Sequence, residues 1–144
     1  MVMRLKTMPP TILEARRADP PRVRGKVYSA AELRDRWRQR GISGPVLYIG
    51  KADNSLRTRL RLFKGSGLGT KSNHEGGKSL WWLADAEDLI VAWRPLDVDQ
   101  RHGFKPAERH EDELLLAFMR DHGGDMPWAN VQPPSLAARA QAGH

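Results

Sequence analysis

The order of apolar and polar residues along the chain predicts short strands interleaved with helices. Short apolar runs between turn residues are typical of strands, and they occur at residues 24–29, 46–50, 80–83 and 89–94. Apolar residues recurring every three or four positions are typical of helices, and they occur at residues 30–40, 56–63 and 107–121. Residues 64–79 hold five glycines without a periodic pattern, which predicts a long loop. The predicted fold class is α+β, with a small sheet and helices beside it.

Polar residues indicate where each predicted helix begins or ends. Ser29 precedes the first helix and Glu32 follows three positions later, which is the pattern of a capping box. Asp53-Asn54-Ser55 predicts a turn and a cap before the second helix. His122-Gly123-Gly124 predicts the end of the third helix, because glycine readily adopts the backbone conformation that closes a helix.

The length of 144 residues suits one compact domain. We expect a proline- and arginine-rich N-terminal arm over residues 1–22, a folded domain over 23–131 and a C-terminal tail over 132–144. The chain has no cysteine, which excludes disulfides and thiolate metal sites. It has neither an apolar stretch long enough to span a membrane nor the apolar core of a secretory signal. We therefore expect a cytoplasmic protein without a membrane partner.

The formal net charge is +7, and it is unevenly distributed. Residues 1–64 carry 16 Lys and Arg against 5 Asp and Glu, whereas residues 65–144 carry 8 against 12. A basic half beside an acidic half favours a face that binds a polyanion. A solvated basic surface without a specific partner is the alternative, and charge alone does not separate DNA, RNA and membrane surfaces.

The predicted helix 56–63 carries three arginines that differ in their positions around the helix. Its buried stripe consists of three residues on one face: Leu56, Leu60 and Phe63. At about 100° per residue, Arg59 falls on the shoulder of this stripe, whereas Arg57 and Arg61 fall on the other flank. An arginine held against the protein body can grip a phosphate with two parallel hydrogen bonds. A snorkelling arginine that covers apolar surface is the alternative.

The helix 107–121 has a carboxylate on its apolar face. Glu111 projects into the middle of the face formed by Leu114, Leu115 and Phe118, and Glu108 lies at the edge of that face. A carboxylate in an apolar stripe is unfavourable unless it is paired or binds a cation. Two hypotheses follow: a partly buried ion pair with an arginine, or a ligand of Mg²⁺, which often takes only one or two protein carboxylates.

Four segments in this order resemble the GIY-YIG nuclease superfamily, and the likeness extends over about residues 23–131. The segments are Tyr48-Ile49-Gly50-Lys51-Ala52, Leu56-Arg57-Thr58-Arg59-Leu60, Glu111 ahead of Leu114-Leu115, and Asn130 in Pro127-Trp128-Ala129-Asn130. The candidate for the family's first motif is Gly25-Lys26-Val27-Tyr28, which precedes Val46 by a longer interval than the family's usual short hairpin.

The resemblance implies a small, mostly antiparallel three-stranded sheet, with Tyr28 and Tyr48 on neighbouring strands that face a cleft floored by Glu111. It implies an endonuclease that hydrolyses DNA phosphodiesters with Mg²⁺ or Mn²⁺. Its catalytic residues would be Tyr28, Tyr48, Arg59, Glu111 and Asn130, with Glu111 as the metal ligand. Five residues would contact DNA: Lys51, Arg57, Arg61, Lys64 and His74.

Two other classes of function stay open. A non-catalytic DNA-binding module would keep the fold and the basic face without turnover. A protein-interaction domain would use Trp81, Trp82 and Trp128, and nucleic acid would then leave its stability unchanged. A homodimer or a protein partner is a further expectation for target choice, because so small a chain has no separate specificity domain.

Overall fold

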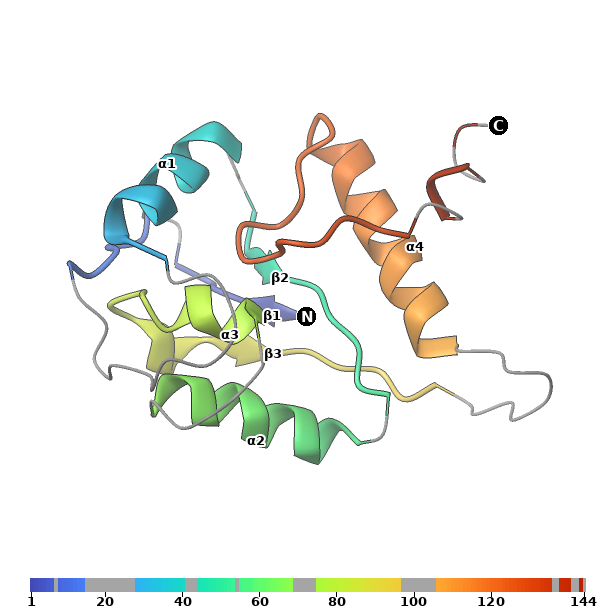
Figure 1. Ribbon diagram of the computed structural model, residues 1–144, viewed down its shortest axis with the longest axis horizontal. Helices are drawn as coiled ribbons and strands as arrows, with labels where there is room; N and C mark the ends of the chain where they lie inside the picture. The colour runs from blue at the N-terminus through green and yellow to red at the C-terminus, as the bar shows by residue number, and fades with distance from the viewer. Residues whose placement is uncertain are drawn as a thin grey trace.

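The computed structural model describes residues 1–6, 8–14, 28–40, 44–53, 55–68, 75–96, 106–135, 138–140 and 143, with only the backbone of 75–77 (Figure 1). The fold is α+β, as predicted. The elements in chain order are β1 (Val2–Met3), α1 (Ala30–Arg40), β2 (Val46–Tyr48), α2 (Leu56–Gly67), α3 (Glu75–Leu80), the 3₁₀ turn η1 (Ala86–Asp88), β3 (Ile90–Val91) and α4 (Pro106–Asp121).

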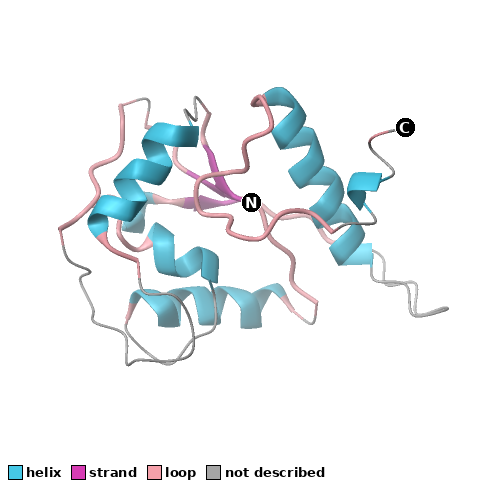
Figure 2. Cartoon of the chain, turned by 45° about the horizontal axis from the view of Figure 1, so that its top comes forward, coloured by secondary structure: helices cyan, strands magenta, loops and turns pink. Residues whose placement is uncertain are grey.

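The three strands form one antiparallel sheet in the order β2-β1-β3. Val2 lies opposite Tyr48 on one side and opposite Val91 on the other. The sheet lies at the centre of the molecule, with α4 on one side and α1, α2 and α3 toward the other (Figures 1 and 2). The central strand therefore comes from the first residues of the chain.

The prediction of a loosely packed arm over residues 1–22 is wrong for its described parts. Val2 and Ile12 are buried, and Ile12 forms an isolated antiparallel bridge with Leu83. The Arg4 guanidinium pairs with Asp85 at 2.8 Å. A strand of two residues is too short to show the alternation by which strands are recognised, so the sequence pattern gave no sign of it.

The predicted start of α1 is confirmed. The Glu32 amide donates to Ser29 Oγ at 3.2 Å, and the Ser29 amide donates to a Glu32 carboxylate oxygen at 2.8 Å. These reciprocal bonds satisfy two amides that a helix start leaves unpaired. Of the strand predicted at 24–29, residues 24–27 lie outside the described residues, and residues 28–29 are not in a strand.

Helix α2 continues four residues beyond its predicted end and therefore takes in part of the predicted loop 64–79. Ser55 caps the helix by accepting from the Thr58 amide, as predicted. The extension includes glycine residues, and each glycine weakens a helix by about 1 kcal/mol relative to alanine. The extended part of the helix is in contact with Trp81. The Trp81 indole donates to the Phe63 carbonyl at 2.9 Å, and a Cβ on Gly67 would lie within 2.7 Å of three indole atoms. Residues 75–79 of the predicted loop belong to α3.

Residues 80–83 do not form the predicted strand. Leu80 ends α3, Trp81 and Trp82 form a turn, and Leu83 makes the bridge to Ile12. Their apolar side chains fill the core from a turn, which a short apolar run does not distinguish from a strand. The predicted strand at 89–94 is present but shorter, as β3, and the predicted strand at 46–50 is β2.

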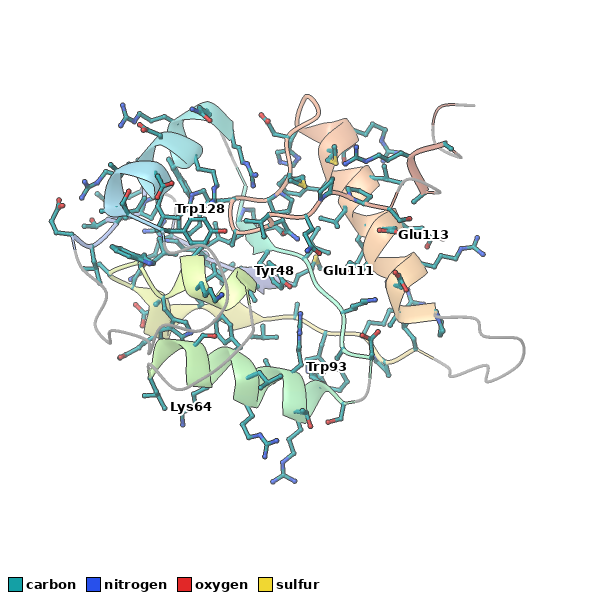
Figure 3. The ribbon with its side chains drawn as sticks, viewed as in Figure 1. Tyr48, Lys64, Trp93, Glu111, Glu113 and Trp128 are labelled. Carbon is teal, nitrogen blue, oxygen red and sulfur yellow. The ribbon has the colours of Figure 1, made fainter. Side chains whose placement is uncertain are left out.

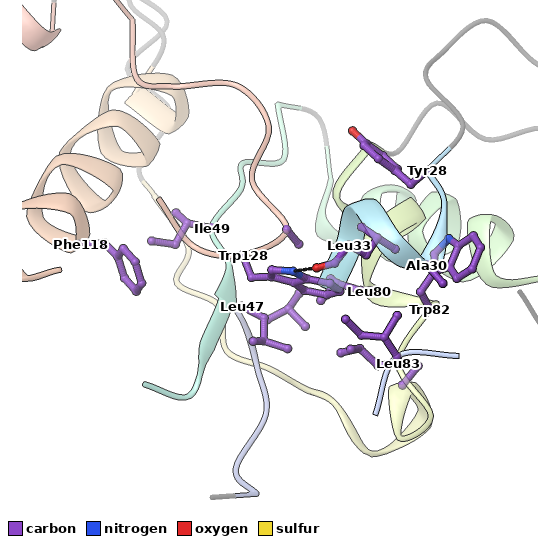
Figure 4. Packing of buried hydrophobic residues seen from close by; sticks show 14 of the residues in the cluster. Tyr28, Ala30, Leu33, Leu47, Ile49, Leu80, Trp82, Leu83, Phe118 and Trp128 are labelled. Atoms are coloured by element: carbon purple, nitrogen blue, oxygen red, sulfur yellow. Dashed lines mark hydrogen bonds between the residues drawn. The ribbon is translucent and has the colours of Figure 1, made fainter. Parts of the chain in front are cut away.

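The core is built around Trp128, which is fully buried. Its indole nitrogen donates to the Leu33 carbonyl at 3.2 Å (Figure 4). Its ring meets Trp37 edge to face, with the ring centroids 5.6 Å apart. The segment that follows α4 is therefore fastened to α1. No helix within the described residues is long and apolar enough to cross a membrane.

Candidate functional site

Tyr48 is the last residue of β2, and its ring lies over the backbone of Gly50. A Cβ at position 50 would come within 2.7 Å of three atoms of the Tyr48 phenol. Real Cβ atoms do not approach other atoms so closely, so any larger residue at position 50 would displace the ring. The close approach of the Tyr48 ring thus explains, on steric grounds alone, why position 50 of the Tyr48-Ile49-Gly50 motif is a glycine.

The phenol of Tyr48 interacts with Arg59 of α2 and with Glu111 of α4. Burial raises the pKa of Tyr48, and the charge of Glu111 raises it further. The charge of Arg59 and its side-chain hydrogen bond to Tyr48 act in the opposite direction. Three side chains from β2, α2 and α4 are therefore close enough to influence one another, and Figure 3 shows Tyr48 and Glu111 between β2 and α4.

Arg59 is half-buried, whereas Arg57 and Arg61 on the same helix are exposed. Its Nε is buried and has no hydrogen-bond partner among the described residues. This is the arrangement expected from the position of Arg59 on the shoulder of the apolar stripe. A buried guanidinium N–H without an acceptor is unfavourable by about 1–3 kcal/mol, which a phosphate oxygen could recover.

Glu111 is half-buried, and burial raises the pKa of its carboxyl. The charges of Lys51 and Arg59 lower this pKa, while those of Asp112 and Asp53 raise it. No ion pair between described residues includes Glu111. The structure therefore does not pair Glu111 with an arginine among these residues, and its carboxylate is partly desolvated in a field of mixed charge.

Lys51 connects two acidic side chains beside this carboxylate. Its Nζ lies 3.4 Å from Asp53 Oδ1 and 3.5 Å from Glu108 Oε2, with 23% of its side chain exposed. The resemblance implied a DNA contact for Lys51, which stays a prediction, and in the structure the Lys51 ammonium group lies beside these two carboxylates. Sequence reasoning did not identify Glu108 and Asp53 as partners of Lys51. The available signal was the spacing of Glu108 and Glu111, because two residues three positions apart share one face of a helix.

Asn130 is buried and holds the backbone next to Tyr48. The side-chain Nδ2 of Asn130 donates to the Ile49 backbone carbonyl at 2.8 Å, and the Ile49 backbone amide donates to the side-chain Oδ1 of Asn130 at 2.9 Å. The Ala129 amide also donates to the Leu47 carbonyl at 2.9 Å. Asn130 acts on the site through the backbone of β2 and the residue after it.

Arg40, which sequence reasoning did not single out, fixes the turn that carries Asn130. Its Nη1 lies 2.6 Å from the Pro127 carbonyl, 3.1 Å from that of Trp128 and 2.9 Å from that of Asn130. One half-buried guanidinium therefore serves three backbone acceptors of the same turn. The last residue of α1 is linked in this way to the residues beside Tyr48.

Tyr28 does not join this site, which corrects the placement that the resemblance implied. It stands just before α1, and the strand beside β2 is β1, formed by Val2 and Met3. Tyr28 is buried, and the Arg36 guanidinium lies 4.6 Å from its ring centroid. In Figure 4, Tyr28 and Ile49 lie at opposite sides of the buried cluster. No tyrosine occupies the strand next to Tyr48.

The remaining predicted DNA contacts differ in what can be said of them. Arg57, Arg61 and Lys64 are exposed along α2, the helix that carries Arg59. His74 lies outside the described residues. The spacing of these three cations places them together on the side of α2 opposite Arg59, where they form an exposed basic stripe that does not face Glu111.

Glu111 is the carboxylate of this site that could hold a divalent cation, and the charges of Lys51 and Arg59 also act on it. No group of three acidic or histidine side chains that could hold a metal occurs among the described residues. A Mg²⁺ ion, however, often takes one or two carboxylates and completes its octahedron with water and substrate phosphate oxygens. The burial that raises the pKa of Glu111 is the cost that a bound cation would offset.

Comparison of the chain with family models, with curated proteins and with solved structures finds no match. The resemblance to the GIY-YIG superfamily therefore depends on the sequence motifs alone and stays a prediction.

Proposed function

We propose that the protein is a metal-dependent DNA endonuclease that hydrolyses phosphodiesters at Tyr48, Arg59 and Glu111. The observation that carries the proposal is the electrostatic contact of Tyr48 with both Arg59 and Glu111, three residues from separate elements. Perturbed phenol and carboxyl groups beside a buried, unpaired guanidinium nitrogen are typical of catalytic sites.

Arg59 would bind the scissile phosphate. Its buried Nε lacks an acceptor, and a guanidinium can donate two parallel bonds to phosphate oxygens. In the transition state the equatorial oxygens carry more charge than in the ground state, so the same bonds strengthen and accelerate the reaction.

Glu111 would hold Mg²⁺, which supplies Lewis-acid stabilisation of the charge that develops on the phosphate and the departing 3′ oxygen. Lys51, whose charge acts on Glu111, would keep this carboxyl ionised at neutral pH. The salt bridges from Lys51 to Asp53 and Glu108 position that charge.

Tyr48 would orient the attacking water. Because burial raises its pKa, the phenol is protonated at neutral pH and presents a hydroxyl that can both donate and accept. Water attacks phosphorus and loses a proton to solvent, the bond from phosphorus to the 3′ oxygen breaks, and the departing 3′ oxygen takes a proton from solvent. Burial raises the pKa of Tyr48 more than the Arg59 charge and hydrogen bond lower it, so Tyr48 would act as a protonated positioning group.

The test is nicking of supercoiled plasmid and cleavage of branched and single-stranded oligonucleotides, each with Mg²⁺, with Mn²⁺ and with chelator. The wild type should nick only with metal, and Glu111→Gln should lose at least 100-fold in rate. Glu113→Gln is the matched control, because Glu113 is exposed on the same helix and pairs with Arg109. Equal nicking by Glu111→Gln and wild type would overturn the assignment.

A non-catalytic DNA-binding module is the second candidate, and one observation favours it. The strand beside Tyr48 carries Val2 and Met3 where the superfamily resemblance implied a tyrosine. Salt-sensitive DNA binding without cleavage under any metal condition would support this module.

A further inference from the structure

Helix α1 carries two arginine pairs on opposite sides. Residues four positions apart share a helix face, so Arg34 and Arg38 lie together, and Arg36 and Arg40 lie together on the other side. Both members of the first pair meet carboxylates: Arg34 pairs with Glu14, and Arg38 lies 2.7 Å from Asp35. Among the described residues, no carboxylate forms an ion pair with either Arg36 or Arg40.

Arg36 is held by groups that leave its charge uncompensated. Its guanidinium lies over the buried Tyr28 ring, 4.6 Å from the centroid, and its Nη1 donates to the fully buried Ser79 hydroxyl at 3.3 Å. Stacking and a single hydroxyl contact orient the planar group and leave other N–H donors of the fork for a ligand.

Arg40 adds a second, partly desolvated charge to this face. Burial lowers its pKa, and the charge of Arg36 lowers it further, while that of Asp125 raises it. The three carbonyls at its Nη1 are neutral acceptors. Two half-buried guanidinium groups therefore repel each other, and a bound anion would reduce this repulsion.

We infer that the Arg36–Arg40 face of α1 binds a backbone phosphate of a nucleic acid, at a site separate from Tyr48, Arg59 and Glu111. A phosphate diester fits because it accepts two parallel bonds from a guanidinium. Nucleic acid as the source of that phosphate depends on the proposed function. This contact would anchor a strand next to α1 while the Tyr48 site acts on another phosphate.

The experiment measures binding of a fluorescent duplex and a fluorescent single strand in chelator, across a salt series. Arg36→Met should raise Kd about fivefold near 100 mM salt and reduce the slope of log K against log salt by about 0.9 for duplex. Arg36→Lys should keep the slope because it keeps the charge. Arg38→Met, the same substitution on the opposite side of α1, should change Kd by less than about 1.5-fold.

A second variant predicts the opposite sign and does not depend on removing a buried contact. Asp125→Asn removes the carboxylate whose charge acts on Arg40 and should tighten DNA binding about twofold. Asp35→Asn makes the same charge change beside Arg38 and should leave Kd unchanged. Thermal unfolding of each variant shows whether it is folded.

Equal salt slopes for Arg36→Met, Arg38→Met and wild type, together with an unchanged Kd for Asp125→Asn, would overturn the inference. Because binding is measured in chelator, a wild type that binds but never cleaves contradicts only the proposed function. A wild type that cleaves while Arg36→Met binds normally contradicts only the Arg36–Arg40 site.

Discussion

The chain has two tyrosines, and each stands beside an arginine in a different way. The Tyr48 hydroxyl shares a hydrogen bond with Arg59, and the charge of Glu111 raises its pKa. Tyr28 offers its ring face to Arg36, near a second arginine and a buried serine hydroxyl. At Tyr48 the phenol hydroxyl interacts with a guanidinium and a carboxylate, whereas at Tyr28 the aromatic ring face interacts with a guanidinium. The two tyrosines therefore stand in different environments, and our two proposals assign catalysis to the first and phosphate binding to the second.

The largest expected contrast is catalytic. Tyr48→Phe removes the hydroxyl that Arg59 and Glu111 act upon and should reduce the nicking rate about 100-fold or more. Tyr28→Phe keeps the ring beneath Arg36 and should change the rate by less than about threefold. Initial rates on supercoiled plasmid with Mg²⁺ measure both. Similar losses of nicking rate in the two variants would contradict this distinction and indicate that Tyr28 takes part in catalysis.

Gly50→Ala should displace the Tyr48 ring without altering any ionisable group. We expect a rate loss of about 10- to 100-fold, because small misplacement of a reacting group reduces catalysis strongly. Gly44→Ala is the control, since its added Cβ would meet only His122 Nε2 at an ordinary 3.6 Å. Full activity of Gly50→Ala would show that the Tyr48 ring position is not needed for the reaction.

Arg40→Met tests the connection between the two tyrosine regions. It removes the donor to three carbonyls of the turn that holds Asn130, and it should lower the free energy of unfolding by about 2–3 kcal/mol. Urea unfolding monitored by tryptophan fluorescence measures the loss. Arg38→Met should change it by less than about 0.5 kcal/mol, because Arg38 is exposed and only pairs with Asp35 on its own helix. Equal values for the two variants would contradict the bracing role of Arg40.

The smallest expected effect is a gain in stability. A carboxyl whose pKa is raised in the folded state stabilises the protein while protonated, and this contribution is lost as pH rises through the folded pKa. Glu111→Gln should therefore stabilise the metal-free protein by about 0.5–1 kcal/mol at pH 7, where wild-type Glu111 is ionised. At a pH below the ordinary value of 4.5 the difference should vanish. Thermal unfolding at both pH values measures it, and a loss of stability at pH 7 would indicate that Glu111 is paired.

The sequence predicted the elements whose signals are local. The capping box of Ser29 and Glu32, the apolar stripe beside Arg59 and the helix that presents Glu111 need only neighbouring residues to be recognised. The elements that depend on distant contacts were missed. Val2 becomes a central strand through its pairing with Tyr48 and Val91, and the glycines of α2 stay helical beneath Trp81.

The same division applies to the candidate site. Helical spacing identified Arg59 and Glu111 from their own segments. The exclusion of Tyr28 depends on which segment fills the strand position beside β2, and two-residue strands leave no periodic trace. The role of Arg40 was equally hidden, because its partners are backbone carbonyls 87 to 90 residues away.

The position of β1 at the centre of the sheet also affects when the sheet can form during translation. Val2 is synthesised before both of its partner strands, which are complete only when residue 91 has been made. At about 5–20 residues per second, the interval is on the order of 10 seconds. Val2 has no partner strand until β2 has been made, and it can pair only with β2 until β3 follows, so the nascent chain must keep Val2 and its neighbours from pairing elsewhere. Synonymous codons that slow translation between β2 and β3 would lengthen this exposure and lower the yield of folded protein without changing a single residue.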